Sequence, residues 1–158
     1  MRTSVAELKE IVHEIRERYN LTPKQILELA EQRTMTFIPL YIFSDRKLGI
    51  LETVVKYLKE ELAMSFKEIG GSIARDNKMV WTVYDNAIKK QPYRLPEKSP
   101  RYLIPLEIFK DKTYGPLTSL VIYCREELGL DNSAISKLIN RDTRTLWAVY
   151  DKARGKRR

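Results

Sequence analysis

The sequence predicts an all-α protein made of tandem trihelical helix-turn-helix units behind a truncated helical N-terminal unit. An internal repeat is the first observation: the segment IPLYIF at 38–43 returns as IPLEIF at 104–109. The segment WTVYDNA at 81–87 likewise returns as WAVYDKA at 147–153, at the same offset of 66 residues. The second observation is apolar spacing of three and four residues, which is typical of helices with one buried face. One helical unit has therefore been duplicated.

The first two helices of each full unit follow from apolar spacing and capping signals. A second helix is expected to open at Ser65, where the serine and Glu68 form a capping-box pattern, and its copy opens near Asp131. The first helix is predicted from apolar residues that share one face, namely Leu48, Leu51, Val55, Leu58 and Leu62, with Leu117, Val121, Cys124 and Leu128 in the copy.

The third helix of each unit follows a tight turn. Asp76 and Asp142 are suited to cap this helix at its N-terminus, since aspartate accepts hydrogen bonds from free backbone N–H groups there. The helix is predicted over about 77–90, and over about 143–154 in the copy.

The segment before the first full unit looks like an incomplete copy. Thr22 and Pro23 suit an N-cap and a first helical position, but Pro39 prevents a third helix. Shifted by 43 residues, five N-terminal residues fall on the apolar face of the next unit: Val5, Leu8, Val12, Ile15 and Tyr19. The expected organisation is a partial helical unit at 1–37, a helix-turn-helix unit at 38–90, an extended Pro-rich linker at 91–103, and a helix-turn-helix unit with a basic tail at 104–158.

Composition favours a polyanionic partner and disfavours catalysis. The formal net charge is +8 and the isoelectric point is about 9.5. One cysteine, Cys124, and one histidine, His13, leave little for a disulfide, a metal site or a histidine-dependent catalytic group. We therefore expect no enzyme, no metal and no cofactor. The chain has no apolar run long enough for a membrane span and no signal-peptide core, so a cytoplasmic, nucleoid-associated protein is expected.

The second and third helices of each unit have the pattern of a DNA-reading pair. In a helix-turn-helix, one helix crosses the DNA backbone and the N-terminal half of the next enters the major groove. Close packing of the two helices needs an apolar residue followed by a small one, and the chain has IG at 69–70 and IS at 135–136. Val80 and Leu146 are the expected inward anchors of the reading helices.

These residues resemble the promoter-reading C-terminal helix-turn-helix of bacterial sigma factors and related trihelical regulators. The resemblance rests on IS at 135–136 before TLWAVYDKA at 145–153, and on IG at 69–70 before MVWTVYDNA at 79–87. It covers about fifty residues in each copy and excludes the polymerase-binding regions of that family. The repeated IPLxIF element lies outside the pattern and points to a tandem regulator of archaeal type. The resemblance implies groove-facing positions at Met79, Trp81, Thr82, Thr145, Trp147 and Ala148.

Basic and polar residues at the helix starts complete the candidate DNA site. Lys78 and Arg144 can reach guanine edges or phosphates, although a solvated helix terminus is an equal alternative. Lys67, and Ser133 in the copy, lie at a helix N-terminus, where backbone N–H groups favour phosphate. The remaining members of the set are Asn77 and Thr143.

Four of the highlighted residues have a structural alternative. Trp81 and Trp147 can fill groove space, but packing in the core against the IPLxIF element is the favoured interpretation. Arg75 and Arg141 recur beside aspartates, so a local structural pair and a DNA contact are equally supported.

The leading hypothesis is sequence-specific binding of double-stranded DNA by two helix-turn-helix modules, with transcription regulation as the role. Since the copies follow one another through a short linker, a direct-repeat DNA site is expected, with half-sites about 10–10.5 base pairs apart. One alternative is an architectural, nucleoid-type protein with low sequence preference. Another is a helical protein-interaction adaptor. The N-terminal unit is expected to cap the next unit or to pair with a second copy in a homodimer.

Overall fold

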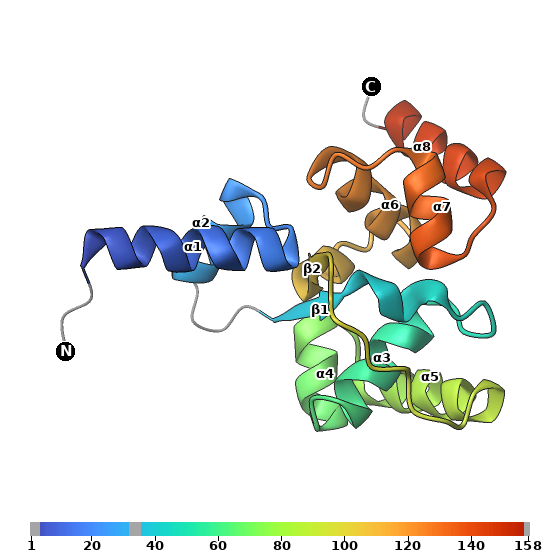
Figure 1. The fold of residues 1–158 in the computed structure, drawn as a ribbon. Helices are drawn as coiled ribbons and strands as arrows, with labels where there is room; N and C mark the ends of the chain where they lie inside the picture. Colours follow the sequence, from blue (N-terminus) through green and yellow to red (C-terminus); the bar gives the residue numbers. More distant parts are fainter. Residues whose placement is uncertain (1–3, 32–35, 157–158) are drawn as a thin grey trace.

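A computed structural model describes residues 4–31 and 36–156. Within these ranges the chain is mostly helical, which confirms the all-α class, and its β structure is limited to a two-stranded ribbon. No helix of the described segments is long and apolar enough to cross a membrane. Figure 1 shows two three-helix bundles, formed by α3 (Ile50–Glu60), α4 (Phe66–Ile73) and α5 (Asn77–Lys90) and by α6 (Pro116–Glu126), α7 (Asn132–Ile139) and α8 (Thr143–Lys156).

The helices begin where the predicted caps lie. Ser65 Oγ accepts a hydrogen bond from the Glu68 backbone N–H at 3.1 Å, and Asp131 Oδ1 accepts one from the Ala134 N–H at 2.8 Å. Asp76 Oδ1 accepts from the N–H of the third helical residue of α5 at 2.7 Å. These side chains satisfy backbone donors that have no partner inside the helix. The predicted N-caps of α4, α5 and α7 are confirmed.

The two IPLxIF segments form the centre of the molecule. Each begins as a short strand, β1 (Phe37–Pro39) or β2 (Leu103–Pro105), and continues as a 3₁₀ helix, η1 (Leu40–Ser44) or η2 (Leu106–Lys110). The strands pair antiparallel, and Ile38 lies opposite Ile104. Since these isoleucines are equivalent positions of the repeat, a local two-fold axis passes between them.

Hydrogen bonds beside the ribbon have the same symmetry. The Leu40 N–H donates to the Tyr102 carbonyl at 3.0 Å, and the Leu106 N–H donates to the Thr36 carbonyl at 2.9 Å. Leu106 and Tyr102 are the repeat equivalents of Leu40 and Thr36, so the second bond is the image of the first. The two bundles are therefore related by a pseudo-two-fold axis. The head-to-tail arrangement inferred from the order of the copies is wrong.

The 3₁₀ helices cross between the bundles. η1 packs on α7, η2 packs on α4, and α3 contacts α6. Phe43 and Phe109, which are 0% and 1% exposed, meet with their ring centroids 6.2 Å apart. One continuous hydrophobic core joins the two bundles. Each bundle thus has part of its core supplied by the segment that precedes the other.

The linker between the bundles is extended, as predicted. Residues 91–102 contain no helix or strand, and β2 begins at the last position of the predicted linker. Leu95 and Tyr102 are 7% and 8% exposed, so the linker is fixed to the body by buried side chains.

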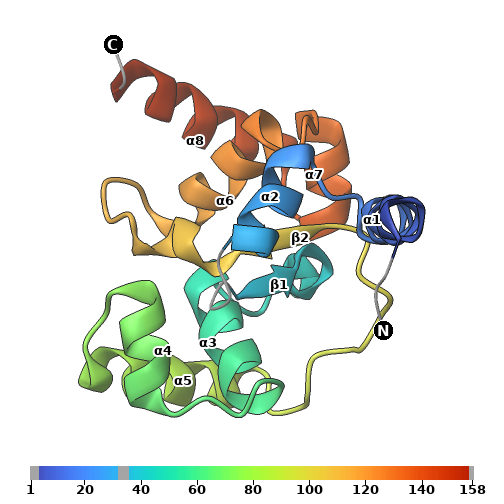
Figure 2. The same ribbon diagram turned by 90° about the vertical axis from the view of Figure 1, so that its left-hand side faces the viewer.

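The N-terminal helices are placed differently from the expected incomplete copy. α2 (Pro23–Glu31) lies against the C-terminal bundle, and Thr22 Oγ1 accepts from the Gln25 N–H at 3.1 Å as the predicted N-cap. α1 (Val5–Tyr19) extends away from both bundles and has no buried residue (Figures 1 and 2). The buried apolar face inferred for α1 is therefore wrong: its exposed members include Val5, Leu8, Val12 and Ile15.

Candidate nucleic-acid interface

The first two turns of α5 and α8 present the predicted site residues to solvent. Val80 and Leu146 are 1% and 0% exposed, so each helix is anchored on its bundle at the predicted position. The residues around the anchors are all exposed: Asn77, Lys78, Met79, Trp81 and Thr82 on α5, and Thr143, Arg144, Thr145, Trp147 and Ala148 on α8.

Both tryptophans are exposed, which corrects the favoured interpretation of them as core residues. Trp81 is 54% exposed and Trp147 is 59% exposed. The IPLxIF segments are not available to cover them, because these segments are buried at the centre of the molecule against α4 and α7. An exposed large aromatic side chain at the same position of both copies is unusual for a purely structural residue.

A basic side chain lies beside each tryptophan. Lys78 precedes Trp81 by three residues, and Arg144 precedes Trp147 by three, so each pair shares one helix face. On α5, one turn beyond Trp81, the Asp85 carboxylate forms an ion pair with Lys89, with Oδ2 2.7 Å from Nζ. Each helix therefore combines a cation that can reach phosphates or base edges with an aromatic surface that can contact sugars or bases.

In each bundle a tight turn joins the second helix to the third, α4 to α5 and α7 to α8. One position beside this turn has little room for a side chain. A Cβ on Gly70 would lie 2.5 Å from the Arg75 carbonyl oxygen, and glycine avoids this clash. In the copy, Ser136 occupies the equivalent position and its Oγ donates to the Arg141 carbonyl at 2.6 Å. The need for a small residue is thus confirmed at Gly70, while the turn of the copy accommodates the serine side chain.

This turn leads to a stability prediction. Gly70→Ala is expected to lower the free energy of unfolding by about 1–3 kcal/mol through overpacking, although alanine favours helices more than glycine does. Gly71 is the matched control, since a Cβ there has nothing within 4 Å. Gly71→Ala should therefore stabilise the protein by up to about 1 kcal/mol. Urea unfolding of both variants measures the difference, and equal stabilities would contradict the proposed clash.

Arg75 and Arg141 each donate a hydrogen bond to the 3₁₀ helix of the other copy. The Arg75 Nη1 donates to the carbonyls of Ile73 at 2.8 Å and Phe109 at 3.3 Å. The Arg141 Nη1 donates in the equivalent way to Ile139 at 3.0 Å and Phe43 at 3.4 Å. Burial lowers the pKa of Arg141, and the nearby Arg46 charge adds to the effect. The structure supports a structural role for both arginines, in contacts with the 3₁₀ helix of the other copy.

Lys67 and Ser133 lie where the sequence places them, near the N-termini of α4 and α7. Both side chains are exposed. The exposed face of each N-terminus can therefore accept a phosphate, because free backbone N–H groups and the helix dipole favour an anion there.

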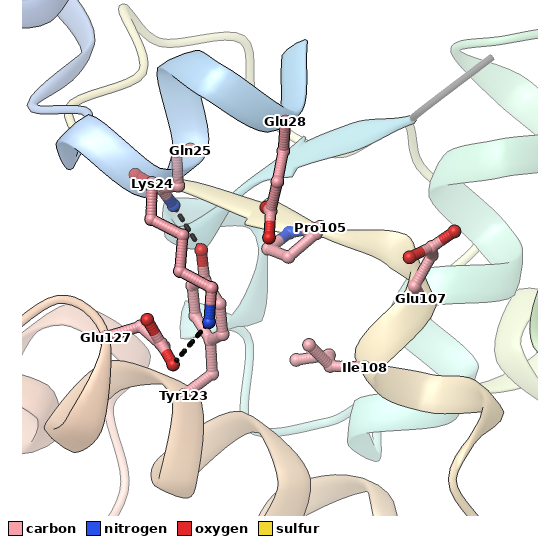
Figure 3. A pocket seen from close by; sticks show the side chains of 8 residues that line it. All are labelled: Lys24, Gln25, Glu28, Pro105, Glu107, Ile108, Tyr123 and Glu127. Atoms are coloured by element: carbon pink, nitrogen blue, oxygen red, sulfur yellow. Dashed lines mark hydrogen bonds and ion pairs between the residues drawn. The ribbon is translucent and has the colours of Figure 1, made fainter. Parts of the chain in front are cut away.

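A contact that the sequence analysis missed fixes α2 on the C-terminal bundle. Gln25 is 1% exposed, and its Nε2 donates to the Leu103 carbonyl at 3.1 Å and to the Tyr123 hydroxyl oxygen. Lys24 adds an ion pair with Glu127 at 3.1 Å (Figure 3). The Thr22–Gln25 spacing of a capping box could have indicated the role of Gln25 at the helix start. Nothing in the sequence indicated its buried partners.

The pocket beside this contact does not suit a DNA phosphate. It has a volume of about 290 Å³ and lies between α2, η2 and α6 (Figure 3). Three glutamates line it, Glu28, Glu107 and Glu127, against one lysine. Burial raises the pKa of the Tyr123 hydroxyl at its edge, while the bond from Gln25 opposes the shift. We interpret the pocket as the seam left where α2 docks.

The described residues contain no cluster of three or more histidine, cysteine or acidic side chains that could hold a metal ion. Cys124 is buried, as predicted, and burial raises the pKa of its thiol to about 12. Since the thiolate is the reactive form, burial and the raised pKa both disfavour reaction of this thiol near neutral pH.

Comparisons with known proteins add no family or relative. No family model matches the chain, and neither the curated proteins nor the solved structures give a significant match.

Proposed function

We propose that this protein binds double-stranded DNA sequence-specifically through two helix-turn-helix modules and regulates transcription. The observation that carries the proposal is the repeated pair of an exposed tryptophan and an adjacent basic residue, Trp81 with Lys78 and Trp147 with Arg144. Each pair lies near the start of the second helix of a short helix-turn-helix, the part that enters the major groove in such proteins.

Charge and the resemblance to sigma-factor modules support the same function. The formal net charge of +8 favours attraction to DNA and fast association. Lys67 and Ser133 would contact phosphates and fix the orientation of each module, while the helix starts read base edges. The resemblance implies that both tryptophans, which are exposed, face the DNA groove.

The architectural alternative is also consistent with parts of the interface. Met79 and the tryptophans offer apolar surface without hydrogen-bonding specificity, apart from the indole N–H, which suits contacts to DNA shape as well as to sequence. Those same side chains could dock a protein partner in the adaptor alternative. Binding measurements separate the three.

The direct test is selection from a randomised duplex library across a salt series. A selected motif supports the proposed function. Binding without a motif that falls steeply with salt would support the architectural alternative. Absence of binding at low salt would contradict both DNA-binding functions.

Removing the two basic readers should weaken binding strongly. Lys78→Ala together with Arg144→Ala is expected to cost about 1–3 kcal/mol for each lost base contact, and to reduce the salt slope by about one for each contact that goes to phosphate. Lys9→Ala together with Arg18→Ala is the matched control, because it also removes one lysine and one arginine. Both lie on α1, which is on the side of the molecule away from α5 and α8 (Figures 1 and 2). Fluorescence anisotropy on the selected duplex measures both. Equal losses in the two double variants would show that only net charge matters.

A further inference from the structure

The pseudo-two-fold axis fixes how the two candidate reading helices are related. The axis follows from the Ile38–Ile104 pairing and from the reciprocal hydrogen bonds of Arg75 and Arg141 to the 3₁₀ helix of the other copy. Both views place α5 and α8 at opposite ends of the two-bundle body, with the ribbon between them and α1 on the other side (Figures 1 and 2). The readers are therefore related by a rotation and not by a translation along the chain.

The relation is held rigidly. Phe43 and Phe109 are buried against each other on the axis, and one core runs through both bundles. Leu95 and Tyr102 fix the linker by burial. Turning one reader around to match a direct repeat would require opening this core, so the direct-repeat arrangement expected from the sequence is not available.

We infer that a single chain reads an inverted-repeat DNA site, an inference that rests on the proposed DNA-binding function. The DNA backbone has two-fold axes perpendicular to its length, and readers related by a two-fold axis meet half-sites of opposite polarity. A direct repeat relates its half-sites by translation along the helix, which the pseudo-two-fold arrangement does not provide. The chain thus acts as a dimer of readers in one molecule.

The two half-sites should differ in sequence. The readers have lysine in one copy and arginine in the other at 78 and 144, and methionine against threonine at 79 and 145. Such differences change which base edges each reader can bond. The site is therefore an inverted repeat with unequal halves. Although the backbone is pseudo-symmetric, the two readers differ in their side chains, so the chain binds the site in one orientation.

The test makes the exposed residues of the two readers identical. Asn77→Thr, Lys78→Arg, Met79→Thr and Thr82→Ala convert the exposed start of α5 into that of α8, and all four side chains are exposed, so the fold should be retained. This full-length variant should select a palindrome with equal halves. The palindrome should bind about 10²–10⁴-fold tighter than one half-site, because the second reader then binds at high effective concentration. Circular dichroism checks folding, and mass measurement should give one chain per duplex.

The same half-site in direct orientation is the control. At spacings from about 5 to about 25 base pairs, which cover one and two helical turns, it should bind no tighter than a single half-site. Tighter binding to a direct repeat, indifference to orientation, or a requirement for two chains would overturn the inference and leave the proposed function intact. Absence of any selected motif, for the variant and the unmodified chain alike, would overturn the proposed function and the inference together.

Discussion

Replacing Phe109 by alanine is expected to lower the free energy of unfolding by about 3–5 kcal/mol and to loosen a helix of the other bundle. Phe109 is 1% exposed, and its 3₁₀ helix packs on α4. Its carbonyl also accepts a hydrogen bond from Arg75, at the turn that follows α4. Loss of the ring should therefore reduce hydrogen-exchange protection in α4 more than in α7, although Phe109 precedes α7 in the chain.

Phe43→Ala, at the equivalent position of the other copy, is the control for this prediction. Phe43 is 0% exposed, its 3₁₀ helix packs on α7, and its carbonyl accepts from Arg141. This variant should lose a similar free energy but reduce protection in α7 more than in α4. Urea unfolding and residue-resolved hydrogen exchange measure the two effects. If each variant instead loosened the bundle that follows the mutated residue in the chain, the packing of each 3₁₀ helix on the bundle of the other copy would not control stability.

Glu60→Gln is expected to destabilise the protein by a comparable amount, about 3–5 kcal/mol, because it leaves a buried charge without an opposite charge. The Lys56 side chain is 0% exposed, and its Nζ lies 2.6 Å and 2.7 Å from the two carboxylate oxygens of Glu60. The position equivalent to Lys56 in the C-terminal bundle is Ile122, so the repeat itself supplies an apolar replacement.

The repeat thus provides the rescue variant for this pair. Lys56→Ile combined with Glu60→Gln removes both charges. It should recover most of the lost stability, since no buried charge is then left without an opposite charge. Urea unfolding of the single and double variants forms a double-mutant cycle. A double variant as unstable as Glu60→Gln alone would show that the lost free energy comes from packing and not from the unpaired lysine.

Local features of the fold could be predicted from the sequence. Apolar spacing predicted the helices of both bundles, and Ser65, Asp76 and Asp131 predicted where three of them begin. These signals act within a few residues, so they survive whatever the tertiary arrangement is. The reciprocal packing could not be predicted in this way. A constant offset between two copies is the same for a direct tandem and for a pair related by rotation.

The candidate site was predicted in position but not in environment. The exposed starts of α5 and α8 lie where the sequence indicated, with Val80 and Leu146 as buried anchors. The burial of the tryptophans was predicted wrongly, because it depended on where the IPLxIF segments pack. The same missing information left the roles of Arg75 and Arg141 undecided, since each has an acceptor in the 3₁₀ helix of the other copy. Contacts that depend on the relation between the copies were therefore beyond the sequence.

The symmetric centre also accounts for which parts of the two copies have stayed alike. At the axis, a residue faces its own counterpart: Ile38 opposes Ile104, and Phe43 touches Phe109. A change in one copy therefore meets an unchanged surface in the other, and both must change together to fit. The exposed reader positions have no such reciprocal partner, so each copy can diverge independently there. A gene that carries both halves keeps its centre nearly identical, at five of six positions in IPLxIF, while the exposed starts of α5 and α8 keep the tryptophan and differ at the four other compared positions.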